Sequence, residues 1–258
     1  MAKTNKLKHA KYNELASLLE SYDKPILILG DVGCGKTTAV MQLAEETNSK
    51  LYFLGSVETS KDFIGIDNEK EKDVPSSFFL SYVNGGILYV DDVSKRKVDI
   101  IMELLTLVKK ESLTVGKKKY PKNKDFKVIL SCENQNELIT NYVKKTIVDR
   151  KLVNMVEFEY DEILEKKICS DKEFYKFFLG VRSFNKDSMF MGATTTALTK
   201  CSKLLETNVF TQEDIIQALL VKGYTVDTLK ELYKHCYPIG EDNPYLVALK
   251  NLIILNSK

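Results

Sequence analysis

Gly30-Asp31-Val32-Gly33-Cys34-Gly35-Lys36-Thr37 is the stretch that decides the fold. It matches GxxxxGK[ST], in which glycines let backbone N–H groups converge on phosphate oxygens and the lysine reaches the terminal phosphates. The apolar run Ile26-Leu27-Ile28-Leu29 precedes it, and a helical pattern over residues 36–47 follows it. The motif requires this strand–loop–helix context. We therefore predict that residues 30–38, through Thr38, bind the phosphates of a nucleotide, with Thr37 as a magnesium ligand.

Apolar runs and helical patterns alternate along the first 160 residues. This alternation predicts a parallel sheet covered by helices on both faces, a three-layer α/β fold. After Asp161 only helical patterns continue, which predicts a small C-terminal helical domain. We expect an N-terminal helix (1–22), an α/β nucleotide-binding domain (23–160) and a helical domain with the tail (161–258). Expected strands are 26–29, 51–54, 87–90, 126–131 and 152–158; expected helices are 10–21, 36–47, 77–84, 98–110, 135–150, 161–180, 188–206 and 212–222; 55–76 is expected to be irregular and 112–126 a hairpin or long turn.

The composition excludes several kinds of chemistry. The 258 residues carry a net charge of +2, two histidines at opposite ends, His9 and His235, and five cysteines without zinc-ligand spacing. A histidine-based metal site, Ser-His-Asp catalysis and a disulfide framework are therefore not expected. No apolar run is long enough to cross a bilayer, so we expect no membrane partner and a cytoplasmic location. Only Arg96, Arg150 and Arg182 are arginines, whose planar fork matches phosphate geometry.

A second motif lies at the end of the third expected strand. The apolar run 87–90 ends in two carboxylates, Asp91 and Asp92. Asp91 is placed to hold Mg²⁺, and Asp92 is placed to orient or deprotonate an attacking water molecule. A polar strand end without a catalytic role is the alternative.

Together these residues resemble the AAA+ ATPases, and most closely the MoxR-like and dynein-related branch, over most of residues 23–222. Asp62-Phe63-Ile64-Gly65 is similar to the family's segment after the second strand. Gly85-Gly86 precedes the third strand, Leu104-Leu105 lies in the following helix, and the expected hairpin 112–126 comes before the next strand. The resemblance implies an AAA+ core of the P-loop NTPase fold with a helical lid, and it implies ATP and Mg²⁺ as ligands.

The resemblance also implies roles for three further residues. Asn134, at the end of the fourth strand, corresponds to sensor 1, which aligns water or contacts the γ-phosphate. Arg150, before the fifth strand, corresponds to the arginine finger that reaches the ATP of a neighbouring subunit. Arg182, which we place at the start of a lid helix, corresponds to sensor 2. The alternatives are a strand-to-helix cap for Asn134 and surface salt bridges for the two arginines. For Arg96 we expect a solvated helix start, with a subunit interface as the alternative.

The chain departs from the family pattern at two positions. Asp92 occupies the place where the family usually has glutamate, which is one methylene longer, so hydrolysis is expected to be slow or conditional. Cys34 is an unusual residue inside the loop, and we interpret it as a packing residue whose backbone N–H still serves phosphate.

The resemblance implies an ATP hydrolase that acts as a homo-oligomeric ring, by family habit a hexamer, and remodels a protein partner. An ATP-gated assembly or scaffold protein with weak hydrolysis is one alternative. A nucleic-acid motor or loader is another, ranked lower because no nucleic-acid-binding domain is recognisable and the net charge is small. The lysine triplet at 117–119 could face a ring pore, but a solvated turn is the preferred interpretation.

Overall fold

The computed structural model describes residues 7–55, 57, 59–64, 75–134, 141–188, 193–220 and 224–257. It divides the chain into two compact units. The sheet unit comprises residues 8–31 and 35–159, and the helical unit comprises residues from Tyr160 onward together with Leu7 and Val32–Cys34. Helix α1 Tyr12–Glu20 lies in the sheet unit, where it contacts strand β7 Asn154–Phe158.

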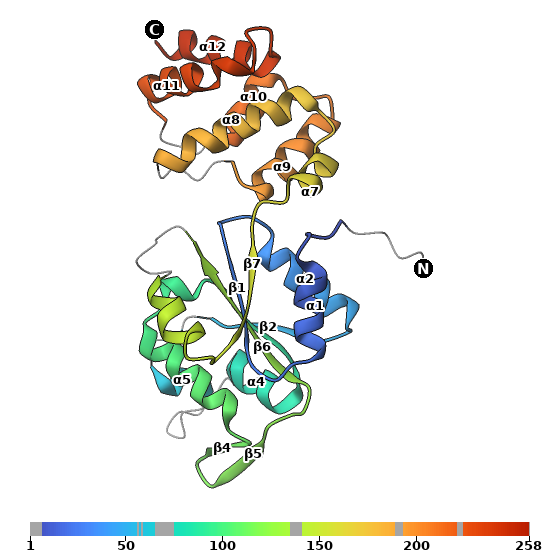
Figure 1. The fold of residues 1–258 in the computed structure, drawn as a ribbon, viewed down its shortest axis with the longest axis vertical. Coiled ribbons are helices and arrows are strands. Elements are labelled where there is room, and N and C mark those ends of the chain that lie inside the picture. The colour runs from blue at the N-terminus through green and yellow to red at the C-terminus, as the bar shows by residue number, and fades with distance from the viewer. Residues whose placement is uncertain are drawn as a thin grey trace. The chain divides into compact units, whose positions relative to one another are not determined.

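The sheet unit is built on five parallel strands, as predicted (Figure 1). They follow the order β2-β3-β6-β1-β7, so β1 is flanked by β6 and β7, far from its neighbours in sequence. In the register of the pairs, Gly30 lies beside both Glu133 and Phe158. The carboxyl ends of β1 and β6 therefore meet at one edge. The strands are β1 Ile26–Gly30, β2 Leu51–Phe53, β3 Gly86–Val90, β6 Phe126–Glu133 and β7 Asn154–Phe158.

Helices cover both faces of the sheet. In Figure 1, α1 and α2 lie on one side of the strands and α5 lies on the other. Alternate residues of a strand point to opposite faces, and here both faces are buried, which explains the nearly continuous apolar runs of β1 and β3. The helical elements are α1 Tyr12–Glu20, α2 Lys36–Glu46, α3 Ser60–Ile64, α4 Ser77–Asn84, η1 Val93–Lys95, α5 Val98–Lys109 and the π-helix η2 Lys144–Val148.

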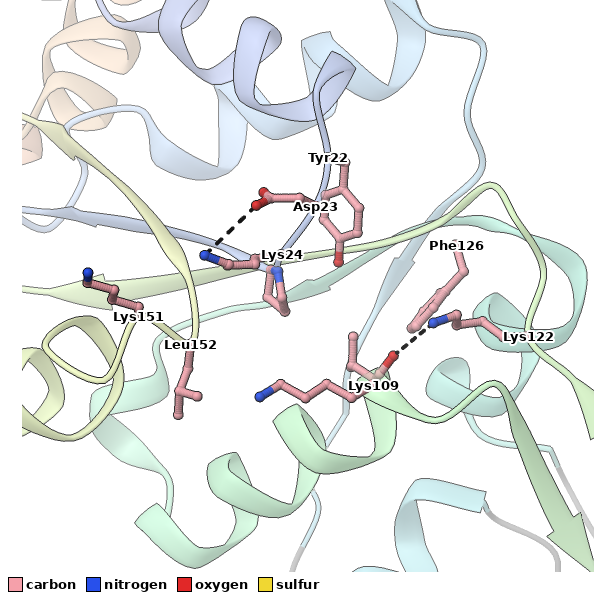
Figure 2. A pocket seen from close by; sticks show the side chains of 10 residues that line it. Tyr22, Asp23, Lys24, Lys109, Lys122, Phe126, Lys151 and Leu152 are labelled. Atoms are coloured by element: carbon pink, nitrogen blue, oxygen red, sulfur yellow. Dashed lines mark hydrogen bonds and ion pairs between the residues drawn. The ribbon is translucent and has the colours of Figure 1, made fainter.

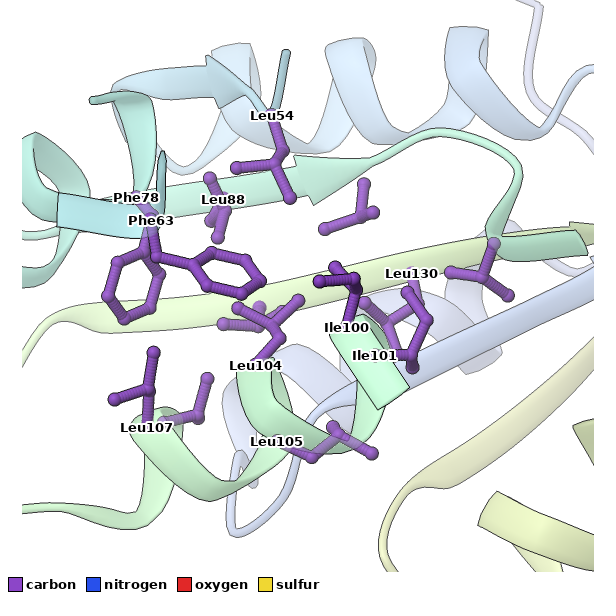
Figure 3. Packing of buried hydrophobic residues seen from close by; sticks show 14 of the residues in the cluster. Leu54, Phe63, Phe78, Leu88, Ile100, Ile101, Leu104, Leu105, Leu107 and Leu130 are labelled. Carbon is purple, nitrogen blue, oxygen red and sulfur yellow. The ribbon is translucent and has the colours of Figure 1, made fainter. Parts of the chain in front are cut away.

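The core under α5 is a continuous apolar cluster, and Figure 3 shows how leucine and isoleucine side chains of α5 meet the sheet. Leu104 and Ile101 on α5 pack with Leu88 and Leu130 from the two neighbouring strands, and these four are at most 2% exposed. Phe63 joins the same cluster from α3 and is fully buried. This short helix lies where we expected irregular chain, so that expectation was wrong at 60–64.

The predicted hairpin is present as β4 Ser112–Val115 paired antiparallel with β5 Lys118–Pro121. The lysine triplet lies at its tip and along β5 with exposed side chains. The predicted helix 135–150 is only partly covered, since 135–140 lies outside the described residues. From 141 the chain is helical, and it leaves helical structure after Val148.

The helical unit contains six α-helices among its described residues, around a core rich in aromatic side chains. Phe174, Phe177 and Phe178 are fully buried and lie among residues of α11 and α12 in this core. The expected helix 161–180 is two helices, because Asp171 accepts a hydrogen bond from the backbone N–H of Phe174 and begins a second one. The helices are α7 Glu162–Ile168, α8 Lys172–Ser188, α9 Thr195–Glu206, α10 Gln212–Leu219, α11 Val226–Cys236 and α12 Pro244–Asn256, with the 3₁₀ turn η3 Tyr237–Ile239.

Candidate functional site

The loop between β1 and α2 has the backbone that phosphate binding requires. Gly35 is the N-cap residue of α2 with φ +105°, a left-handed conformation that glycine adopts without steric cost. Gly30 is restricted by space, because a Cβ atom there would lie 2.1 Å from the carbonyl oxygen of Phe158. Cys34 is 1% exposed and packs in the interior. Thr38, in the first turn of α2, is exposed.

Lys36 is folded back onto the loop. Its Nζ donates to the carbonyl oxygens of Gly30, at 2.8 Å, and of Asp31, at 2.7 Å. The residue is only 7% exposed, and the ammonium group is held inside the loop by these two carbonyls. A phosphate group would give this ammonium a fully charged partner, and such hydrogen bonds are stronger than those to neutral carbonyls.

A chain of hydroxyl contacts links α2 to the end of β3. The Thr37 hydroxyl lies 3.0 Å from the Tyr89 hydroxyl, which donates to Asp91 Oδ1 at 3.1 Å. Ser131, fully buried on β6, donates to the same Asp91 oxygen at 2.9 Å. Burial raises the pKa of Tyr89, so this phenol stays protonated and acts as a donor. The two residues predicted as magnesium ligands, Thr37 and Asp91, are therefore connected through a single hydroxyl group.

Asp92 has a different environment from Asp91. It is 5% exposed, adopts φ +46°, and caps η1 by accepting from the backbone N–H and the hydroxyl of Ser94. Its other oxygen, Oδ2, lies 2.8 Å from Nζ of Lys95. Burial disfavours the charged carboxylate, but Lys95 and Ser94 outweigh burial, and the pKa of Asp92 is lowered. The predicted water-activating residue thus has Oδ1 in hydrogen bonds, while Oδ2 accepts no hydrogen bond within the described residues and is close only to the charge of Lys95.

Glu133 and Asn134 lie at the end of β6, beside the first residue of the loop. The backbone N–H of Asn134 donates to the carbonyl oxygen of Gly30 at 3.2 Å, and its side chain is exposed. The backbone N–H of Glu133 donates to Asp92 Oδ1 at 3.4 Å, and its Oε2 lies 3.5 Å from Lys95 Nζ. Burial and the neighbouring charge of Asp92 raise the pKa of Glu133. Two carboxylates therefore share one lysine at the edge of the sheet.

The two arginines of the sheet unit differ in what they contact. Arg150 lies in the turn after η2 with an exposed side chain, which makes no hydrogen bond or ion pair within the described part of the chain. Arg96 donates to the carbonyl oxygens of Leu54, at 3.2 Å, and Gly55, at 3.0 Å, just beyond β2. Burial lowers the pKa of Arg96. The expectation of a solvated Arg96 was therefore wrong.

Arg182 lies within α8 and not at the start of a helix, because the helix that begins at Lys172 continues to Ser188. Its guanidinium donates to both oxygens of Glu165, at 2.6 and 2.9 Å, and its Nε donates to the carbonyl oxygen of Ala193 at 2.8 Å. It also stacks over the Tyr160 ring, 3.8 Å from the centroid. All three of its nitrogens are engaged within the helical unit. A role as sensor 2 stays a prediction, and it requires an exchange of these partners.

Sequence reasoning missed four side chains that organise this site: Tyr89, Lys95, Ser131 and Glu133. Two of them carry a recognisable signal, since Ser131 and Glu133 are polar residues ending an otherwise apolar strand. Tyr89 could not be found, because a tyrosine inside an apolar strand is normally a core residue.

A cavity of about 280 Å³ lies away from this site, at the amino ends of β1 and β6, and Figure 2 shows Lys24, Lys109, Lys122 and Lys151 around it. The cavity and the phosphate-binding loop therefore lie at opposite ends of strand β1.

The donors at the strand ends suit Mg²⁺. Within the described residues, no group of three or more His, Cys, Asp or Glu side chains could hold a metal ion by itself. Mg²⁺ commonly binds through one or two protein oxygens, with water and substrate phosphates completing its shell. Thr37 and Asp91 offer such oxygens beside the phosphate-binding loop.

The described residues contain no helix long and apolar enough to cross a membrane.

Comparison with known proteins finds a family model that matches part of the chain. The model of the AAA domain, dynein-related subfamily, matches residues 25–151, and it does not distinguish the MoxR-like branch. Among solved structures, NtrX from Brucella abortus in complex with ATP is 16% identical over 88% of this chain and 56% of its own, with a TM-score of 0.47. NtrX from the same organism in complex with ADP is 14% identical over 94% of this chain and 49% of its own, with a TM-score of 0.44. The Hsp104–ADP complex of S. cerevisiae is 17% identical over 58% of this chain and 32% of its own, with a TM-score of 0.41. The chain spans about half the length of these NtrX chains.

Proposed function

We propose that this chain, whose residues 25–151 match the AAA domain of the dynein-related subfamily, hydrolyses ATP in a homo-oligomeric ring and uses the energy to remodel a protein partner. The observation that carries the proposal is the contact chain from Thr37 through the Tyr89 hydroxyl to Asp91. It joins the phosphate-binding helix to the acidic end of β3, so groups for phosphate and for a metal ion lie together.

Each residue of the loop has a defined part in nucleotide binding. The backbone N–H groups of residues 31–37 surround the phosphates, and the N-terminus of α2 adds a favourable field. Lys36 exchanges its carbonyl partners for β- and γ-phosphate oxygens. Thr37 and Asp91 would hold Mg²⁺, which supplies charge neutralisation for the phosphates. Asn134 aligns the water or contacts the γ-phosphate, and the part expected of Asp92 requires that one of its oxygens exchange its present partner for water.

The ring is proposed because of Arg150. Its exposed guanidinium has no partner within the described residues, so it is available to a neighbouring subunit's γ-phosphate, where it would stabilise transition-state charge. Arg182 would sense the same phosphate from the helical unit if it left Glu165. Six subunits, as in the family resemblance, are the proposed ring size.

ATP turnover at increasing protein concentration tests the proposal. We expect activity per subunit to rise with concentration, and Lys36→Ala and Arg150→Ala each to lose it by at least about 100-fold. Lys145→Ala, another exposed cation on the same segment, is the matched control and should keep wild-type activity. Mixing the Lys36→Ala and Arg150→Ala variants should restore turnover. The Lys36→Ala subunit still supplies Arg150, and the Arg150→Ala subunit still binds the nucleotide through Lys36.

Failure of the mixture to recover any activity would contradict a finger that acts between subunits. Tight ATP binding without turnover in the wild type would favour a second candidate, an ATP-gated assembly protein. That candidate is supported by one specific observation, which is that Asp92 Oδ1 caps η1 and Oδ2 is ion-paired with Lys95.

A further inference from the structure

Residues 32–34 of the phosphate-binding loop belong to the helical unit, and strand pairing explains how they reach it. Gly30 lies beside Phe158 in the register of β1 and β7. Val32 and Tyr160 each lie two residues beyond that pair, and the Tyr160 hydroxyl donates to the carbonyl oxygen of Val32 at 2.9 Å. One hydrogen bond therefore ties the loop to the first residue of the helical unit after β7.

This hydrogen bond fixes the orientation of one peptide plane in the loop. The peptide between Val32 and Gly33 is trans, so its carbonyl and its N–H point in opposite directions. While Tyr160 holds the carbonyl, the N–H of Gly33 faces away from the tyrosine. Gly33 also has φ +66°, and successive N–H groups beside a left-handed residue form a concave site for anions. The tyrosine thus orients a phosphate donor from the opposite side of the peptide.

A second side chain of the helical unit closes on the same peptide. A Cβ atom built on Gly33 would lie 2.7 Å from the hydroxyl oxygen of Thr194, so a side chain at residue 33 has no room. Thr194 is itself fixed, because its hydroxyl caps α9 by accepting from the backbone N–H of Ala197 at 3.1 Å. The peptide is therefore held at its carbonyl by one residue and at the following Cα by another.

Arg182 supports both of these contacts. Its guanidinium lies 3.8 Å from the centroid of the Tyr160 ring, and this cation–π contact restricts the ring. Its Nε donates to the carbonyl oxygen of Ala193 at 2.8 Å, immediately before Thr194. The guanidinium is itself held by both oxygens of Glu165, and its side chain is only 11% exposed. Arg182 can therefore influence the loop from the position in which it lies, without leaving Glu165.

We propose that Tyr160 is a positioning residue for nucleotide binding, which holds the peptide between Val32 and Gly33 in its phosphate-binding orientation, and that Arg182 acts by supporting Tyr160. The inference rests on the proposed function, because it requires that the loop receive a nucleotide. A loop that is already oriented loses less conformational freedom when its ligand binds. That benefit applies to ATP and ADP alike, whereas a direct contact of Arg182 with the γ-phosphate would favour ATP alone.

The experiment measures ATP and ADP affinity of the full chain by calorimetry, together with steady-state ATP turnover. Tyr160→Phe removes the hydroxyl but keeps the ring beside Arg182. We expect both affinities to fall by the same factor, roughly three- to tenfold, as for the loss of one hydrogen bond. The KM for ATP should rise while kcat stays within about twofold of wild type. Tyr175→Phe is the matched control, because it removes a hydroxyl that donates to Glu165 in the same unit, and it should keep both affinities.

Arg182→Lys tests the supporting residue. Lysine keeps the charge but has no planar guanidinium to stack on Tyr160 and no Nε to donate to Ala193. We expect the ATP and ADP affinities to fall together again. A loss of ATP affinity alone would assign Arg182 to the γ-phosphate and overturn its proposed part, and unchanged affinity for both nucleotides would overturn it as well.

Wild-type affinity of Tyr160→Phe for both nucleotides would overturn the inference. Unequal losses for ATP and ADP, or a loss confined to kcat, would also overturn it. An equal loss in Tyr175→Phe would do the same, because the effect would then belong to the stability of the helical unit. Failure of the proposed function has a different signature: wild type and Lys36→Ala would bind and hydrolyse ATP alike. That result would remove the nucleotide from the loop and this inference with it.

Discussion

Two ion clusters in this chain use the same kinds of charge in opposite surroundings. In the helical unit, Arg182 donates to both oxygens of Glu165, and the two side chains are 11% and 0% exposed. In the sheet unit, Lys95 pairs with Asp92 at 2.8 Å and reaches Glu133 at 3.5 Å, but the lysine side chain is 72% exposed. One cluster is sealed from water, and the other has a solvated cation.

The difference separates a structural ion pair from an adjustable one. Every nitrogen of Arg182 has a partner, and Glu165 also accepts from Thr195 at 2.5 Å and from Tyr175 at 3.3 Å. Removing one partner there leaves a buried charge uncompensated. The ammonium group of Lys95 can exchange its carboxylates for water because it is itself 72% exposed, and an ion pair with an exposed member contributes less free energy than a sealed one. A ligand can therefore reorganise the strand-end cluster far more easily than the helical one.

The largest expected effect comes from breaking the sealed cluster. Glu165→Gln removes the negative charge opposite Arg182, and we expect the free energy of unfolding of the helical unit to fall by about 3–5 kcal/mol. Hydrogen exchange read by mass spectrometry measures this unit by unit. Glu162→Gln, in the exposed pair with Lys166, is the control and should change little. If Glu165→Gln and Glu162→Gln showed the same hydrogen-exchange rates in the helical unit, the ion pair between Glu165 and Arg182 would not stabilise that unit.

A smaller loss is expected when the charge is kept but its geometry is changed. Arg182→Lys retains a cation but cannot donate two parallel hydrogen bonds to Glu165 and a third to Ala193. We expect a loss of about 1.5–3 kcal/mol, the range for hydrogen bonds to charged groups. The measurement is again unit-resolved hydrogen exchange. Lys95→Arg is the counterpart in the sheet unit and should be nearly neutral, and a large loss there would contradict the contrast.

The third effect concerns the cap within the strand-end cluster. Asp92→Ala removes the acceptor that caps η1, and loss of such a cap costs about 0.5–2 kcal/mol. Ser94→Ala removes one donor to the same oxygen and should cost less. Thermal unfolding followed by circular dichroism compares the two variants. Equal stability of Asp92→Ala and wild type would mean that the capping contacts contribute nothing to the free energy of unfolding. The predicted role in activating water would then be the one that remains for Asp92.

Sequence reasoning worked where the signal is local. The strand, loop and helix from Ile26 to Glu46 follow from one apolar run, the glycines and one amphipathic pattern, and the hairpin follows from turn residues. Sequence reasoning gave the wrong position for Arg182 within its helix. It missed the N-cap at Asp171, so the helix was expected to end at residue 180, whereas α8 continues to Ser188. Glu133 carries no signal of its own beyond being a polar residue next to Asn134. Its pairing with Asp92 arises because β3 and β6 are adjacent in the sheet, and a pairing across strands has no signature within either strand.

The smallest expected effect is the sharpest test of the contrast. Lys95→Met removes the ion pair but keeps the length of the side chain, and we expect the free energy of unfolding to change by less than about 1 kcal/mol. Salt distinguishes the two clusters further, because at 1 M ionic strength charges are screened beyond about 3 Å in solvent but much less in the interior. The small contribution of Lys95 should therefore shrink at high salt, so that the difference between wild type and Lys95→Met narrows, while the loss in Glu165→Gln should persist. A Lys95 contribution that stayed unchanged at 1 M salt would mean that the strand-end cluster is as sealed from water as the helical one.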